Sequence, residues 1–192
     1  MTKQSKILNI LYETAHAEYG SALEMLAACK KSQSPSLAFG YFHHSKDEYI
    51  HTATFFSILA KRSQKIKTNE ARKLRFRPYF VRTKGYISPK GFLIDFMKIK
   101  DFIAFVYTNE LLAKSSFEKI HTLLGPQTED GEKIKQIMND ELLHHGMAKK
   151  HFLKYYPTLQ PWQLMLYKTR EQIKNKSRKI NEKNLKFLEI IF

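Results

Sequence analysis

The sequence predicts an all-α protein built from four long helices around one core. Glycine and proline are scarce, at 7 and 6 of 192 residues, and hydrophobic residues make up 43%. This composition is typical of a globular, helix-rich chain. Apolar residues recur at helical spacing in several long stretches, and the motif Asp-Glu-x-x-His occurs twice within them. We expect one helical domain over residues 1–156 and a basic, apolar helical extension over residues 157–192.

The first two helices are expected at the N-terminal end of the domain. Residues 6–31 carry one broad apolar stripe at helical spacing. After a short polar turn, Ser34 is the expected N-cap of the second helix and Pro35 its first residue. This helix is expected to end near Lys61, and it carries the first copy of the motif at residues 47–51.

A long basic connection is expected over residues 62–91. It holds ten lysines and arginines against one acid, and Pro78 and Pro89 interrupt any long helix there. One short helix is expected near residues 68–74. A connection of this length allows the third helix of the domain to run parallel to the second.

The last two helices of the domain are separated by a Gly-Pro pair. The third is expected from about Pro89 to Leu124, with a break near Lys100. The fourth is expected over residues 129–153, with three acids in its first turns, where the helix dipole favours them. It carries the second copy of the motif at residues 140–144.

The motif places a carboxylate and an imidazole on one face of each of two helices, because residues three apart are neighbours on a helix. Two such helices, joined by one glutamate from each of two others, provide the ligands of a di-iron or di-manganese site. The candidate metal ligands are Glu18, Glu48, His51, Glu110, Glu141 and His144.

Other residues compete for some of these roles. Glu13 and Glu24 are alternatives to Glu18, and Glu118 is an alternative to Glu110. Four further histidines are expected at the surface or at the ends of the helices, because a histidine without a spaced partner is usually not a ligand. They are His43, His44, His145 and His151.

The charge balance favours a pair of divalent cations. Four buried carboxylates need compensating charge, and two divalent ions supply it while the imidazoles stay neutral. Carboxylate and imidazole donors suit iron, with manganese as the alternative, rather than thiolate-bound structural zinc. Asp47 and Asp140 each precede a candidate histidine by four residues, and we expect them to accept an N–H from the imidazole on the facing helix.

Several segments together resemble one enzyme family. They are His-Ala-Glu-Tyr-Gly-Ser-Ala at residues 16–22, Glu-Leu-Leu-Ala at 110–113, Asp-Glu-Leu-Leu-His-His at 140–145 and Arg-Phe-Arg-Pro at 75–78. They are similar to the demethoxyubiquinone hydroxylase family of the ferritin-like di-iron superfamily. The resemblance favours Glu18 and Glu110 as ligands. It implies a ferritin-like four-helix bundle with a long crossover between helices 2 and 3.

The same resemblance implies an activity. The family hydroxylates a quinone in ubiquinone biosynthesis, using two iron ions, O2 and an electron donor, with the lipid delivered through a peripheral membrane face. This chain departs from the family by a basic insertion before Arg75. It also has Phe92–Asp101 where the family has a glycine-rich apolar crossover. We therefore expect an O2-dependent di-iron monooxygenase whose substrate, a quinone or another lipid-like molecule, stays open.

The net charge of +15 predicts an anionic partner, either an acidic membrane surface or nucleic acid. Apolar residues lie beside cations in residues 92–106 and again in the tail from Trp162 onward, and they would form either interfacial helices or core. The alternatives to the hydroxylase are a di-iron hydroxylase of tRNA, and iron storage or peroxide scavenging of the ferritin or rubrerythrin kind. An oligomer, such as a dimer, is left open.

Cysteine usage and hydropathy bear on the compartment. Cys29 is the only cysteine, so no intramolecular disulfide can form, and a reducing compartment fits best. The first residues lack the apolar core of a signal peptide, and no stretch is apolar enough for a membrane span. We expect a cytoplasmic protein that can bind peripherally to the inner face of the membrane.

Overall fold

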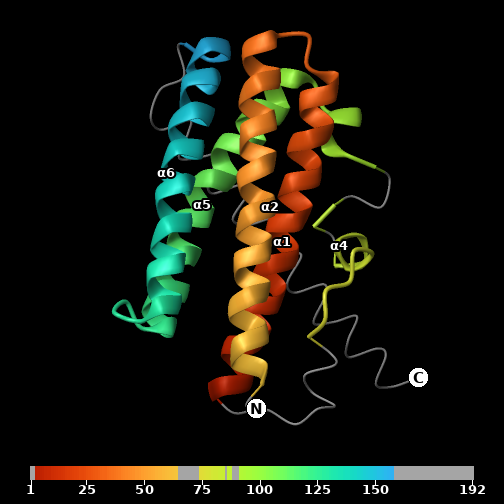
Figure 1. Cartoon of the computed structure of the whole chain (residues 1–192). Coiled ribbons are helices and arrows are strands. Elements are labelled where there is room, and N and C mark those ends of the chain that lie inside the picture. The colour runs from red at the N-terminus through yellow and green to blue at the C-terminus, as the bar shows by residue number, and fades with distance from the viewer. Residues whose placement is uncertain (1–2, 65–73, 85, 88–90, 158–192) are drawn as a thin grey trace, which may run out of the picture.

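The computed structural model describes residues 3–64, 74–84, 86–87 and 91–157. All regular secondary structure in these residues is helical, which confirms the all-α class. Four long helices lie alongside one another (Figure 1): α1 (Lys3–Lys31), α2 (Pro35–Ser63), α5 (Ile99–Leu124) and α6 (Glu129–Tyr155). Two short elements, α4 (Phe80–Thr83) and the 3-10 helix η1 (Leu93–Asp95), lie between α2 and α5 in the chain.

Helices α1 and α2 form a hairpin and make the most extensive pairing in the structure, followed by α5 with α6. Ser34 has extended backbone at the N-cap of α2, and Pro35 is its first residue, as the sequence predicts. Away from the turn, the Ser45 hydroxyl donates to the Ala22 carbonyl at 2.8 Å and ties the two helices together. Helix α2 also packs on α6, which joins the two pairs.

The expected start of the third helix is wrong. Helix α5 begins at Ile99, well after Pro89, because Lys98 has extended backbone (φ −63°, ψ 145°) and interrupts the helical path. Residues 93–95 instead form η1, in which the Asp95 carboxylate accepts a hydrogen bond from the Phe92 N–H at 3.1 Å. The break expected near Lys100 thus corresponds to the beginning of the helix.

The turn between α5 and α6 follows the expected pattern. Gly125 ends α5 with φ +91°, a backbone conformation that residues with a side chain rarely adopt. The Thr128 hydroxyl caps α6 by accepting from the Gly131 N–H at 3.0 Å. A Cβ on Gly131 would lie 2.2 Å from the Gly125 carbonyl oxygen, so this tight approach requires glycine.

Part of the basic connection is held against α1 by aromatic rings. The imidazole of His16 is fully buried and stacks on Phe76, and its Nε2 accepts a hydrogen bond from the Arg77 N–H at 3.3 Å. Tyr12 packs edge-on against Phe80 of α4. The short helix expected at residues 68–74 falls almost entirely outside the described residues, as does the C-terminal extension from residue 158 onward.

Two apolar clusters lie along the four helices, one on each side of a polar layer. The first includes Leu11, Phe55, Phe117 and Ile134, and the second includes Met25, Tyr41, Phe102 and Phe152. On every long helix the buried polar residues come between these two sets in the sequence, except Asp130 at the start of α6. The clusters stabilise the helices, since each fully buried large apolar side chain contributes about 1.5–3 kcal/mol, and they enclose the polar layer between them.

The apolar stripe over residues 92–106 divides between core and surface. Ile103 and Val106 are 1% and 3% exposed and belong to the second cluster, so this part of the stripe is core. Phe96 is 58% exposed. Among the described residues, none of the helices combines the length and the hydrophobicity required to cross a lipid bilayer.

Candidate metal centre

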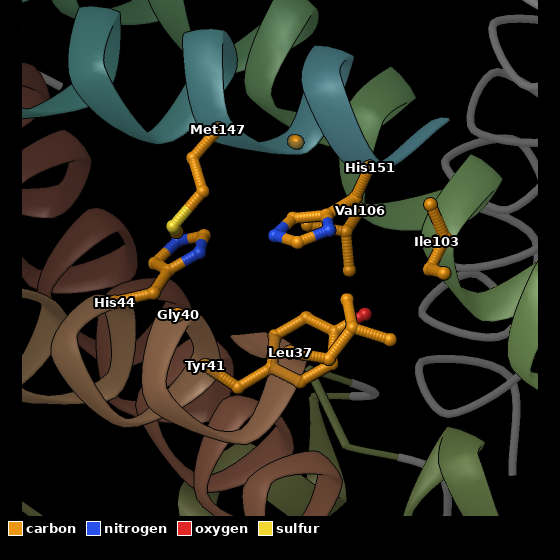
Figure 2. Close-up of a pocket in the computed structure, with 9 residues that line it drawn as sticks. Leu37, Gly40, Tyr41, His44, Ile103, Val106, Met147 and His151 are labelled. Carbon is orange, nitrogen blue, oxygen red and sulfur yellow. The ribbon is translucent and has the colours of Figure 1, made fainter. Parts of the chain in front are cut away.

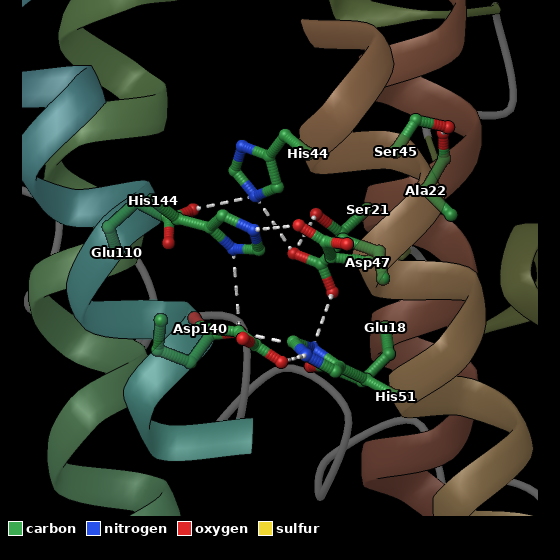
Figure 3. Close-up of polar contacts among 12 residues, drawn as sticks. Glu18, Ser21, Ala22, His44, Ser45, Asp47, His51, Glu110, Asp140 and His144 are labelled. Atoms are coloured by element: carbon green, nitrogen blue, oxygen red, sulfur yellow. Dashed lines mark hydrogen bonds and ion pairs between the residues drawn. The ribbon is translucent and has the colours of Figure 1, made fainter. Parts of the chain in front are cut away.

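The six candidate ligands lie together in the polar layer between the two clusters. Figure 3 shows Glu18, His51, Glu110 and His144 among them. Each of the four long helices contributes at least one of them. All six side chains are buried, with exposed fractions between 1% and 8%. The residues are Glu18 on α1, Glu48 and His51 on α2, Glu110 on α5, and Glu141 and His144 on α6.

The imidazole of His51 lies among three carboxylates. Its Nδ1 is 3.3 Å from Glu18 Oε2, 3.2 Å from Glu141 Oε1 and 3.8 Å from Glu48 Oε2. Its Nε2 faces the opposite way and lies 3.2 Å from Asp140 Oδ2, so that the ring N–H donates to this carboxylate. The contact with Asp140 fixes which ring nitrogen points at the glutamates.

The imidazole of His144 has the same arrangement with the helices exchanged. Its Nε2 lies 3.2 Å from Asp47 Oδ2, and its Nδ1 lies 3.8 Å from Glu141 Oε1. Each aspartate of the repeated motif therefore contacts the histidine of the other copy, across α2 and α6. These are the contacts that the spacing of Asp47 and Asp140 predicts.

The sequence-based expectation for His44 is wrong. His44 is 1% exposed rather than at the surface or a helix end. Its Nε2 lies 3.0 Å from Glu48 Oε1 and 3.4 Å from Glu110 Oε1, and its ring stacks on His144 with centroids 3.9 Å apart. The signal was present in the sequence, because His44, Glu48 and His51 follow one another at steps of four and three and share one face of α2.

The competing residues lie elsewhere or bind other groups. Glu13 and Glu118 are exposed, and a Glu13 carboxylate oxygen accepts a hydrogen bond from the Tyr86 hydroxyl at 2.8 Å. Glu24 is buried, but it accepts a hydrogen bond from the Leu93 N–H at 2.9 Å and so anchors η1 to α1. Burial raises the pKa of Glu24 to about 7.

Of the other three histidines, His43 is exposed, while His145 and His151 are half-buried. His43 lies next to His44 in the sequence, yet its ring packs against Phe39 and Phe42 at the surface of α2. The expectation that His43 is a surface residue is therefore confirmed. Adjacent histidines on one helix thus have opposite environments.

Burial and mutual repulsion shape the protonation of the glutamates. Burial, followed by the charge of Glu48, holds the pKa of Glu18 well above its usual range. Burial, followed by the charge of Glu141, does the same to the pKa of Glu110. Burial also acts on Glu48, but hydrogen bonds from His44 and His51 outweigh it, and the pKa of Glu48 is lowered.

The pKa values of the two histidines of the repeated motif shift in opposite directions. Burial alone would lower the pKa of His51, but its contacts with Glu141, Glu18 and Glu48 outweigh this effect and raise the pKa. Burial lowers the pKa of His144, and the nearby charge of His44 lowers it further. A proton held by His51 thus offsets part of the carboxylate charge that a metal ion would otherwise neutralise.

Several buried polar atoms of the layer have no hydrogen-bond partner. Among them are Glu48 Oε2, Glu110 Oε2 and His144 Nδ1. A buried polar atom without a partner costs about 1–3 kcal/mol, so such atoms call for a ligand or an ion. All three are atoms that bind iron or manganese well.

The donor atoms fall into overlapping groups, in each of which they lie within 4.8 Å of one another. One group is Glu18, Glu48, His51 and Glu141; a second is Glu110, Glu141 and His144; a third is His44, Glu48 and His144. Glu48 and Glu141 each belong to two groups, so these two glutamates are shared between candidate cation positions.

An apolar pocket adjoins the layer on the side of His44 (Figure 2). It lies between α2, α5 and α6, and it is narrow, with room for about one water-sized molecule. Met147 reaches across it from α6 toward Gly40 on α2, where an added Cβ would lie 2.9 Å from the Met147 sulfur. Its lining residues are Leu37, Gly40, Tyr41, His44, Ile103, Val106, Met147, Ala148 and His151.

Comparisons of the chain with protein-family models, with curated proteins and with solved structures found no match. The assignment of this centre therefore depends on the residues of the chain and on their geometry.

Without metal, the glutamates of the centre should destabilise the protein. We expect Glu110→Gln to raise the free energy of unfolding of the metal-free chain by about 1–2 kcal/mol, since it removes a buried carboxyl that is repelled by Glu141 and Glu48. Urea unfolding in the presence of a chelator measures the change. Glu118→Gln, on the exposed face of the same helix, should leave stability unchanged, and equal effects of both variants would contradict the electrostatic account.

Proposed function

We propose that this chain is a non-haem di-iron oxidoreductase that uses O2 to hydroxylate an organic substrate. The observation that carries the proposal is the convergence of four buried carboxylates and of imidazoles from four helices, with partnerless oxygen and nitrogen atoms among them. Iron is the proposed metal because oxygen and imidazole donors suit it, and manganese is the alternative.

We further propose that the four long helices form a ferritin-like bundle. Two features support this: the Glu-x-x-His pairs come from α2 and α6, and single glutamates come from α1 and α5. The long connection between α2 and α5 fits the crossover of such bundles. This arrangement agrees with the resemblance of the sequence to the demethoxyubiquinone hydroxylase family.

In this proposal each iron has its own ligands and the two share carboxylates. Glu18 and His51 would hold one ion, Glu110 and His144 the other, and Glu48 and Glu141 would bridge them. Grouping of the donor atoms around these shared glutamates supports the assignment. A ferrous pair bound by these residues would supply electrons for the reduction of O2.

The protein itself contributes orientation and exclusion of water. Asp140 and Asp47 hold the imidazoles of His51 and His144 with Nδ1 toward the glutamates. The apolar clusters on both sides keep bulk water from the layer. In the overall reaction one oxygen atom enters a C–H bond of the substrate and the other becomes water, with two electrons and two protons from an external reductant.

The exposed side chains of α2 and α6, two of the helices that carry candidate ligands, support a lipid-like substrate. Helices α2 and α6 each carry exposed apolar side chains and exposed lysines, the combination found on surfaces that contact an acidic membrane. The apolar residues are Phe39, Phe42, Ile50, Leu142 and Leu143, and the lysines are Lys46, Lys149 and Lys150. Substrate hydroxylation at such a surface is the proposed role of the chain.

A second candidate, hydroxylation of tRNA, is favoured by charge. The chain carries +15, and Arg75 and Arg82 in the described part of the basic connection are exposed. Phosphate contacts by such residues would make RNA binding steeply dependent on salt. The metal centre would be the same in both cases.

Metal analysis tests the centre itself. The purified chain, loaded anaerobically with Fe2+ and desalted, should retain two irons, and Glu48→Ala or His144→Ala should lose them because each removes a donor from two groups. Glu118→Ala, exposed on α5, is the control and should retain both irons. Retention of two irons by either ligand variant would contradict the site assignment.

Substrate class is tested by exposing the iron-loaded protein and a chemical reductant to O2, with a membrane lipid extract in one reaction and tRNA in another. We expect a mass gain of one oxygen atom in a lipid component, which is absent with Glu48→Ala. A gain in a tRNA nucleoside instead would favour the second candidate. Iron oxidation with no oxygenated product in either reaction would favour iron storage or peroxide scavenging.

The apolar pocket is the proposed approach for O2. Gly40→Ala places a methyl group against the Met147 sulfur and should push that side chain into the pocket. We expect oxidation of the bound ferrous ions by O2 to slow by about tenfold, corresponding to roughly 1.4 kcal/mol, at unchanged iron content. Gly146→Ala, where an added Cβ meets no atom within 4 Å, is the matched control. Equal rates in both variants, followed by stopped-flow absorbance, would exclude this route.

A further inference from the structure

We infer that His44 is a third imidazole ligand of the centre, so that the two metal positions have different donor sets. The inference depends on the proposed di-metal function and adds a residue that lies outside the repeated motif. His44 comes four residues before Glu48 on α2, on the face that carries Glu48 and His51. It is the residue that the structure adds to the predicted set.

The contacts of His44 are those of a ligand directed at one side of the centre. Its Nε2 lies 3.0 Å from Glu48 Oε1 and 3.4 Å from Glu110 Oε1, which belong to different helices. Together with Glu48 and His144 it forms one of the three groups of donor atoms close enough to hold an ion. An ion placed there would contact His44 Nε2 and the glutamates at once.

The opposite edge of the ring supports the same orientation. His44 Nδ1 is buried and has no hydrogen-bond partner, and the ring forms part of the wall of the apolar pocket. Apolar surroundings on this edge leave Nε2 as the ring nitrogen directed at the carboxylates, where its N–H donates to Glu48 in the metal-free chain and where a bound ion would take the place of that proton. A neutral imidazole with a free lone pair is the form that binds a metal ion.

The arrangement makes the centre asymmetric. The position between Glu110 and His144 would have two imidazole donors, whereas the position between Glu18 and His51 would have one. A second nitrogen donor shifts the preference of a site from manganese toward iron.

The number of bound imidazoles can be counted directly. Each imidazole bound to high-spin Co2+ gives one N–H proton signal that is shifted far outside the normal NMR range and disappears in D2O. With the full chain loaded anaerobically with two Co2+, we expect three such signals in the wild type and two in His44→Ala. His43→Ala is the matched control, since this adjacent histidine is exposed, and it should keep three.

Every possible number of shifted N–H signals either supports or overturns the role of His44. Two signals in the wild type with two bound Co2+, or three in a folded His44→Ala, would overturn the role of His44 and leave the di-metal centre intact. A wild type that binds no Co2+ or Fe2+ would overturn the proposed function as well. Because loss of the buried ring could impair folding, His44→Gln is measured alongside, and circular dichroism identifies the folded variants. His44→Gln should also give two signals.

Discussion

Repulsion among four buried carboxylates is the constraint on which the rest of this structure depends. At an effective dielectric constant of about 20, two carboxylates 4 Å apart repel by roughly 4 kcal/mol. Glu18, Glu48, Glu110 and Glu141 are each at most 8% exposed and lie in one layer. Such a layer is stable only with protons, imidazolium ions or metal ions among the carboxylates. The raised pKa values of Glu18 and Glu110 reflect the metal-free compromise.

The surrounding architecture serves to hold this layer in place. Apolar clusters on both sides supply the stability that the layer lacks, and the hairpin of α1 and α2 fixes Glu18 relative to Glu48. The reciprocal contacts of Asp47 with His144 and of Asp140 with His51 lock α2 against α6. A hydrophobic core of the same size would be more stable, so the polar layer is best explained as serving function rather than stability.

The repeated motif predicted more of the site than of the fold around it. The three-residue spacing identified the pairs Glu48 and His51, and Glu141 and His144, because residues three apart lie on the same face of one helix. Spacing along α2 alone did not identify His44 as part of the site. Its position there depends on α5, which brings Glu110 to 3.4 Å from the His44 ring. The start of α5 was misplaced because the backbone turn at Lys98 leaves little trace in composition. The burial of Ile103 and Val106 likewise could not be predicted from the sequence of their own helix, because it depends on packing against residues of other helices.

The most direct test of the central claim is the anomalous scattering of a crystal of the anaerobically iron-loaded chain at the iron absorption edge. The account predicts two peaks about 3.5–4 Å apart, both within the layer and on either side of the line between Glu48 and Glu141. No peak in this layer at full iron loading, or iron bound only at surface residues, would contradict it.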